Sequence, residues 1–429
     1  MSNDTPANST TTLPSVHRTR TIIVLIVGMI ACGGLLMFLS PRTDPAILRL
    51  PAVVTPRDQQ HAREAFELKY GRPADRHDML SFLAEMYLAG GRPADAVECF
   101  AEIPTSHPRY GPMARFQQGR TLLTLHRAVE AEKEFRELIA REEAAPSIEP
   151  KYLVDARQRL RHILEVELRF EERRELLKGV IARGEADHFE TIVYCFPSHL
   201  RWNGDDARQW LEEFHAANPS DRLLNIALGR YRTGQGKLAE ARTLLEEIVR
   251  QSPGDLRATA ALVACLRESD DADVADRLIE ALPLQAATDP WLLLLQRGAH
   301  ALERGLTDVA ARAYDQLLAH DHTNTEAWQK TAMISRILGD EPKRKRAVVV
   351  AAGLSRIQNH IGKGLKSPED PNSFLDIAYL CAEIEFDTEG WILAKYAERL
   401  APDNPRVVAM IKLLRSRKQT TSKTNPGNE

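Results

Sequence analysis

A regularly spaced pattern of helical hairpins constrains the fold of this 429-residue chain more than any other feature. The clearest copy is residues 79–108, MLSFLAEMYLAGGRPADAVECFAEIPTSHP. Leu83, Ala84 and Tyr87 recur at helical spacing, and a Gly-Gly pair that can end the helix follows them. A second helix follows, with Ala96 and Phe100 on one face. The segment predicts two helices that approach closely through small side chains, with aromatic rings filling the space beside them.

Units of this kind recur along most of the chain. They begin near residues 77, 112, 153, 188, 222, 256, 291, 325 and 371, and six of the eight intervals are 34 or 35 residues long. The order of residue types (bulky, Leu, small, Tyr, Ala, Phe and Pro) and the period resemble the tetratricopeptide repeat (TPR). The resemblance implies an all-α, right-handed superhelical solenoid of about nine hairpins. It also implies that the first helices of the hairpins line a concave groove for a protein or peptide segment.

The remaining segments precede, follow or interrupt this array. We expect an array with an extra N-terminal helix at 57–405 and a capping helix at 406–418, since a repeat array needs a polar outer face at its end. The two longer intervals predict a loop at Glu142–Glu149 and a lengthened second helix within Pro342–Lys366. Residues 1–20 and 419–429 have the composition of disordered tails, and 41–56 form a proline-rich spacer.

One segment predicts a membrane anchor at 21–40. Ile22–Leu39 is eighteen residues without a charge, and a helix of that length spans about 27 Å of a bilayer core of about 30 Å. Two alternatives stay open: a cleaved signal peptide, and a lipoprotein anchored through Cys32. Arginines on the two sides nearly tie, but the short basic tail before the span favours an N-terminus inside. The prediction is a single-pass membrane protein of bacterial type with a periplasmic repeat array.

Composition argues against several classes of function. Lys plus Arg (57) nearly balance Asp plus Glu (60), so no nucleic acid is expected as a partner. The five cysteines are scattered singly, which favours buried small residues over a zinc or redox site. His320-Asp321-His322 falls in an expected loop between repeats, with no third metal ligand near it. We find no catalytic motif, and the sequence predicts no enzyme activity, no cofactor and no metal.

The expected groove carries a basic bias. First-helix positions that the core does not use hold seven arginines and no lysine, in a chain of nearly neutral charge. An acidic protein or peptide segment is the partner that such a surface would take, because guanidinium groups pair bidentately with carboxylates. The candidate groove residues are Arg120, Arg157, Arg161, Arg230, Arg257, Arg267, Arg336, Phe116 and Tyr379.

These features together predict a membrane-tethered scaffold or adaptor for protein–protein interaction, of the kind that envelope assembly would use. Two alternatives remain beside it. The chain is a lipoprotein-type assembly factor if Cys32 is the anchor, or a non-catalytic subunit of an envelope enzyme complex.

Overall fold

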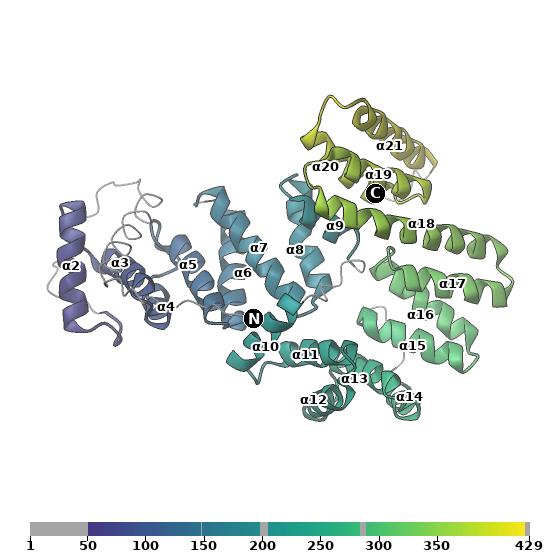
Figure 1. The fold of residues 1–429 in the computed structure, drawn as a ribbon, viewed down its shortest axis with the longest axis horizontal. Coiled ribbons are helices and arrows are strands. Elements are labelled where there is room, and N and C mark those ends of the chain that lie inside the picture. Colours follow the sequence, from purple (N-terminus) through teal and green to yellow (C-terminus); the bar gives the residue numbers. More distant parts are fainter. Residues whose placement is uncertain (1–49, 147, 198–204, 284–288, 425–429) are drawn as a thin grey trace, which may run out of the picture. The chain divides into compact units, whose positions relative to one another are not determined.

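The computed structural model describes residues 50–424, apart from 147, 198–204 and 284–288. These residues form 20 α-helices and no strand, so the predicted all-α fold is confirmed for the described part of the chain (Figure 1). None of the described helices is both long and apolar enough to cross a membrane. The predicted anchor at 21–40, with Cys32, lies outside the described residues.

The chain divides into two compact units after Leu125. The first unit packs its helices in sequence order around one core, in which Leu83, Tyr87, Ala96 and Phe100 are all buried as the hairpin pattern predicts. Its helices are α2 (Pro56–Tyr70), α3 (Arg76–Ala89), α4 (Pro93–Ala101) and α5 (Gly111–Thr124).

The second unit holds the other sixteen described helices, α6 to α21. The first half are α6 (Ala128–Ala144), α7 (Pro150–Val166), α8 (Phe170–Ala182), α9 (His188–Cys195), α10 (Asp205–Ala217), α11 (Arg222–Gly234), α12 (Leu238–Gln251) and α13 (Leu256–Glu268). The second half are α14 (Ala272–Glu280), α15 (Trp291–Glu303), α16 (Thr307–His320), α17 (Thr325–Leu338), α18 (Glu341–Lys366), α19 (Pro371–Glu383), α20 (Asp387–Leu400) and α21 (Pro405–Thr424).

Seven helix pairs pack as hairpins, and each has one residue of left-handed backbone in its turn. The pairs are α3/α4, α7/α8, α11/α12, α13/α14, α15/α16, α17/α18 and α19/α20. This conformation lets the chain leave one helix and reverse direction within a few residues, and it favours glycine. Three of the turns use another residue, which is sterically costly. In chain order the turn residues are Gly91, Leu168, Gly236, Asp270, Gly305, Gly339 and Glu385.

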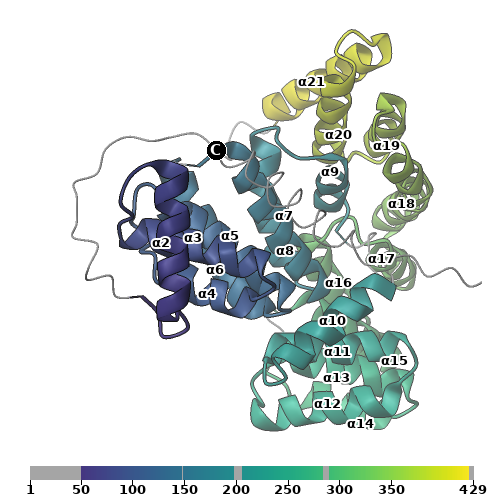
Figure 2. The same ribbon diagram turned by 60° about the vertical axis from the view of Figure 1, so that its left-hand side comes forward.

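The fourth predicted hairpin, beginning near 188, is opened in the structure, and the prediction was wrong at that point. Helix α9 packs against α8, α18 and α20, whereas α10 packs against α7 and α11 (Figures 1 and 2). Ile192, Cys195 and Phe196 are fully buried within the core formed by α18 to α21. The apolar residues of this eight-residue helix are thus covered by repeats far along the chain, which spacing within one unit does not reveal.

Two further boundaries differ from prediction. Helix α6 continues to Ala144 and buries Glu142, so the expected loop is shorter than Glu142–Glu149. Helix α21 continues to Thr424, beyond the predicted end at 418, because the polar residues after Lys418 do not stop a helix. The lengthened helix within Pro342–Lys366 is confirmed as α18, which has 26 residues.

Two glycines explain how closely the paired helices approach. A Cβ on Gly229 of α11 would lie 2.6 Å from the Leu245 side chain, and one on Gly298 of α15 would lie 2.7 Å from the Tyr314 ring. Both glycines occupy the same position in their repeat, eight residues into the first helix. Only a residue without a side chain permits this contact.

We therefore predict opposite effects for two substitutions in one helix. Gly229→Ala should destabilise the second unit by about 1–3 kcal/mol, because the added methyl overpacks a core contact. Gly234→Ala is the matched control, since a Cβ there meets nothing within 4 Å, and it should be neutral or stabilising by up to about 1 kcal/mol. Urea denaturation of both variants measures the difference, and equal stabilities would contradict the close packing.

Candidate functional site

Three aromatic and basic side chains meet where α8, α11 and α15 approach one another. Trp291 is the first residue of α15 and Phe170 the first of α8, and their ring centroids are 6.3 Å apart. The Arg230 guanidinium of α11 lies 5.4 Å from the centre of the Trp291 ring and 5.9 Å from that of Phe170. It also donates a hydrogen bond of 3.4 Å to the Leu168 carbonyl, in the turn before α8. Phe170, Arg230 and Trp291 therefore bring three segments that are distant in sequence into one cluster.

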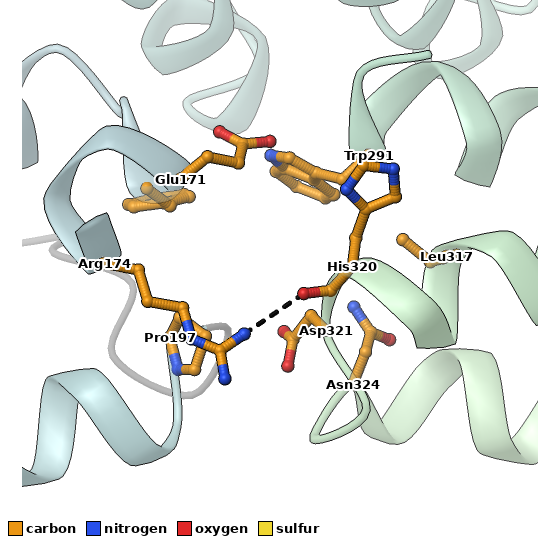
Figure 3. A pocket seen from close by; sticks show the side chains of 9 residues that line it. Glu171, Arg174, Pro197, Trp291, Leu317, His320, Asp321 and Asn324 are labelled. Carbon is orange, nitrogen blue, oxygen red and sulfur yellow. Dashed lines mark hydrogen bonds between the residues drawn. The ribbon is translucent and has the colours of Figure 1, made fainter. Parts of the chain in front are cut away.

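An aromatic pocket lies on one side of Trp291. Its volume is about 50 Å³, enough for a few water molecules or part of one side chain. Phe170, Pro197, Trp291 and Leu317 give it mostly apolar walls, and Glu171, His320 and Asp321 stand at the polar positions (Figure 3). The Arg174 guanidinium closes one side by donating a 3.2 Å hydrogen bond to the His320 carbonyl (Figure 3).

A basic pocket of about 40 Å³ adjoins it and shares Trp291 and Glu171. Arg230 and Arg257, both predicted groove residues, line this pocket together. The Arg257 side chain is 43% exposed, and its partner is Glu172 at 3.4 Å. Glu167 and Arg169, from the turn between α7 and α8, also line it. The basic pocket is therefore lined both by partly accessible guanidinium groups and by residues of a buried network of charged side chains.

Arg169 is the centre of that network. It lies within 2.6 Å of carboxylate oxygens of Glu132 from α6, Glu167 at the end of α7 and Glu172 from α8. Arg136 also bonds two of the same carboxylates, Glu132 at 2.7 Å and Glu172 at 2.9 Å. The Arg169 side chain is only 10% exposed, so these charge-assisted bonds act with little screening by water.

Glu167 is the carboxyl of this network with the most perturbed environment. Its side chain is 1% exposed, and burial raises its pKa to about 7, although the nearby Arg169 acts in the opposite direction. The carboxylates of Glu132 and Asp221 raise the pKa further. Glu172, in contrast, has a lowered pKa because its bonds to Arg169 and the charges of Arg257 and Arg136 outweigh its desolvation.

Besides Arg257, three of the predicted groove arginines form ion pairs with carboxylates. Arg157 is 5% exposed and lies 3.0 Å from both Glu143 and Glu185. Arg161 lies 3.0 Å from Glu165, and Arg267 lies 2.8 Å from Glu303. Internal ion pairs of this kind cancel much of the positive potential that the sequence predicts for a continuous groove.

The other predicted residues lie apart from the two pockets. Phe116 is 1% exposed in the first unit, so it serves the core, and Arg120 stacks on its ring at 5.5 Å. In the second unit, Arg336 is exposed in the last turn of α17. Tyr379 is half-buried beside the Arg406 guanidinium, which is 5.8 Å from its ring. Of the predicted residues, Arg230 and Arg257 line one of the two described pockets together.

Sequence reasoning missed Phe170, Trp291, Glu167 and Arg169. Trp291 stands at the start of a predicted unit, three residues before the bulky core position that Leu294 fills, so the repeat pattern assigned it no role. One signal was present for the turn: Leu168 stands where four other hairpin turns in the described part of the chain have glycine, and its φ is 56°. An unusual residue in a costly conformation marks a turn that the surroundings hold in place.

Comparison with known proteins agrees with the hairpin architecture. Residues 232–297 match the family model described as tetratricopeptide repeat. This segment runs from the end of α11 into α15. Within this segment the chain is similar to the tetratricopeptide repeat. No curated protein matches the chain.

A comparison with solved structures finds weak similarity to several, among them the following two. The crystal structure of the APC/C hetero-tetramer Cut9–Hcn1 is 13% identical, with 83% of this chain and 81% of that chain covered and a TM-score of 0.33. The human IFIT1 dimer with m7Gppp-AAAA is 12% identical, with 88% and 89% covered and a TM-score of 0.34. At these scores neither structure carries an argument about what the repeats bind.

The buried carboxyl of Glu167 predicts a pH-dependent stability. Its native pKa of about 7 exceeds the value of about 4.3 for an unfolded glutamate, so the folded chain holds a proton that the unfolded chain releases between these values. Its contribution to stability is present below pH 4.3 and is lost as the pH rises towards 7. Glu167→Gln should therefore gain stability over the wild type from pH 4.5 to 7 and keep that gain at pH 8.

Thermal melts of both proteins across this pH range measure the effect. Glu175→Gln is the control, because the Glu175 side chain on α8 is 74% exposed, and its difference from the wild type should not change with pH. A constant difference between Glu167→Gln and the wild type would contradict the assignment.

Proposed function

We propose that this chain is a protein-interaction scaffold whose repeats bind an acidic segment of a partner protein at the basic pocket beside Trp291. The observation that carries the proposal is that Arg230 and Arg257, selected from sequence as groove residues, line one pocket. Tetratricopeptide repeats bind protein partners, and the match at 232–297 includes all of α13, which bears Arg257, and begins two residues after Arg230.

The chemistry of the pocket suits a carboxylate. The Arg257 guanidinium is nearly half exposed, and its contact with Glu172 is the longest that Glu172 makes to an arginine. A ligand carboxylate can join Arg257 while Glu172 keeps its bonds to Arg169 and Arg136. The planar fork of a guanidinium binds a carboxylate by two parallel hydrogen bonds, which fixes orientation as well as charge.

The aromatic pocket supplies a neighbouring subsite for an apolar side chain. Its walls are Phe170, Pro197, Trp291 and Leu317, and Trp291 is shared with the basic pocket. A segment with a bulky apolar residue next to an acidic one would fill both pockets. Burial of the apolar side chain would contribute affinity, at about 25 cal/mol for each Å² removed from water, and the carboxylate would contribute orientation.

A binding selection tests this function. The full chain, purified in detergent, is used to select from a library of displayed random peptides, and we expect enrichment of acidic residues beside a bulky apolar one. Arg257→Gln should weaken binding of a selected peptide about tenfold, the value of one charge-assisted hydrogen bond. Arg250→Gln is the matched control, because Arg250 is 72% exposed on α12 and pairs only with Glu247 among the contacts described for its side chain.

Salt gives a second measurement of the same property. Binding should weaken as salt rises, since the screening length falls from about 10 Å at 0.1 M to about 3 Å at 1 M. Enrichment of neutral or basic peptides, or binding that Arg257→Gln leaves unchanged, would overturn the proposed function.

We further propose that the scaffold is tethered to a membrane by residues 21–40 and that the repeats face an extracytoplasmic space, where an envelope assembly process would use them. The eighteen uncharged residues of Ile22–Leu39 support a span, and the basic residues before them support this orientation. A lipoprotein anchor at Cys32 is the alternative.

Reporter fusions and one substitution separate these anchors. A reporter fused after residue 60 should show extracytoplasmic activity, and Cys32→Ser should leave both the mass and the membrane retention of the chain unchanged. Loss of mass corresponding to a lipid would favour the lipoprotein anchor, and cytoplasmic reporter activity would reverse the orientation.

A further inference from the structure

Glu167 faces the pocket that Arg230 and Arg257 line, although its side chain is almost completely buried. It occupies the C-terminal cap of α7, and its neighbour Leu168 turns the chain into α8 with a left-handed backbone. The Glu167 carboxylate accepts a 2.6 Å hydrogen bond from Arg169. The Glu167 carboxyl therefore lies in the wall between the buried network and the basic pocket. A charge added on either side changes the electrostatic environment of this carboxyl.

Charged groups approach Glu167 from every helix around it. Glu132 and Arg136 come from α6, and Asp221 caps the start of α11. The groups of α8, α11 and α13 that line the pocket or join the network are Glu171, Glu172, Arg230 and Arg257. Arg169 already binds three carboxylates, Glu132, Glu167 and Glu172, so it cannot offer Glu167 an undivided counter-charge.

A ligand carboxylate in the basic pocket adds another negative charge near Glu167. Two carboxylates that share one small site do not both remain ionised readily, because each disfavours the charged form of the other. Water cannot screen this repulsion well, since the Glu167 side chain is 1% exposed. The least costly response is for Glu167 to become neutral.

We propose that the basic pocket binds an acidic segment together with one proton, and that Glu167 is the residue that takes up this proton. The proton comes from solvent and is held by a carboxyl oxygen of Glu167, so no covalent bond of the ligand changes. This inference rests on the proposed function of the same pocket. It adds that the affinity for an acidic partner rises as the pH falls through neutrality.

The environment of Glu167 places this uptake of a proton in the pH range around neutrality. Burial raises the pKa of Glu167 to about 7 before any ligand is present, so a neighbouring carboxylate moves the pKa above neutrality. A further rise of about one pKa unit on binding makes the affinity about fivefold higher at pH 6 than at pH 8. The carboxylates of the ligand stay ionised over this range, since ordinary Asp and Glu have pKa values near 4.

The test measures peptide affinity against pH for the full wild-type chain and four variants, all in detergent. The probe is a fluorescein-labelled peptide pool with a central Leu-Glu-Glu between random residues, and a Leu-Gln-Gln pool is its neutral control. Fluorescence anisotropy should give about fivefold tighter binding of the acidic pool at pH 6 than at pH 8. Glu167→Gln keeps the shape of a protonated glutamate, and it should bind at pH 8 as tightly as the wild type does at pH 6, with no slope between.

Two variants exclude other titrating groups. Glu171→Gln removes an exposed carboxyl of the same pocket, and His320→Gln removes the imidazole of the aromatic pocket. Both should retain the pH slope, whatever their effect on the affinity itself. Calorimetry of the wild type in phosphate and in Tris at pH 7.5 should show uptake of protons on binding, which Glu167→Gln abolishes.

The outcomes separate the two proposals. Acidic-pool binding that is lost in Arg257→Gln but is independent of pH, or a slope that survives in Glu167→Gln, overturns proton uptake by Glu167 and leaves the proposed function intact. If the wild type binds the acidic and neutral pools equally, the proposed function fails and the inference about Glu167 fails with it.

Discussion

The bonds of Arg169 to carboxylates of three helices are the interaction on which the described site depends. Glu132, Glu167 and Glu172 are brought to one guanidinium, and this fixes how α6, α7 and α8 meet. Removing Arg169 would leave its buried carboxylates without their shared counter-charge, which costs far more than the set contributes as a whole. The value of the network is therefore specificity of arrangement. It holds the start of α8, with Phe170, against Arg230 and Trp291.

That placement of α8 changes what the repeats can bind. In an open array each first helix would present its own surface, and the pattern of arginines would give a continuous basic groove. Here α8 contributes to the surface near α11, α13 and α15, and α9 is buried against α18 to α20. The chain's own middle segment thus takes part of the space that the resemblance assigns to a ligand. The two small adjoining pockets beside Trp291 suit one or two side chains of a partner better than a long extended peptide.

The local part of the fold was predictable because its causes are local. Helical periodicity, turn glycines and small residues at helix crossings act within about 34 residues, so the starts of α11, α13, α15, α17 and α19 coincide with the predicted unit starts. The opened pair α9 and α10 was not predictable in this way. Helix α9 contributes Ile192 to a core whose members from α18 to α21, such as Leu354 and Phe374, lie more than a hundred residues away, so α9 is separated from α10. Spacing within one repeat carries no information about such contacts.

The charge of the candidate site could likewise be predicted only in part from residues within one repeat. Counting arginines at groove positions identified Arg230 and Arg257, but it gave equal weight to Arg157, which Glu143 and Glu185 neutralise. The sign of a surface depends on which carboxylates fold back onto it, and these come from other helices. The exposed fraction of the side chain then distinguishes an arginine that serves the structure from one that can bind a ligand. The Arg157 side chain is 5% exposed and offers a ligand no surface, whereas the Arg257 side chain is 43% exposed and does. Because Arg257 and the buried Glu167 line the same pocket, the charge that reaches a partner is set as much by the interior of the protein as by its surface.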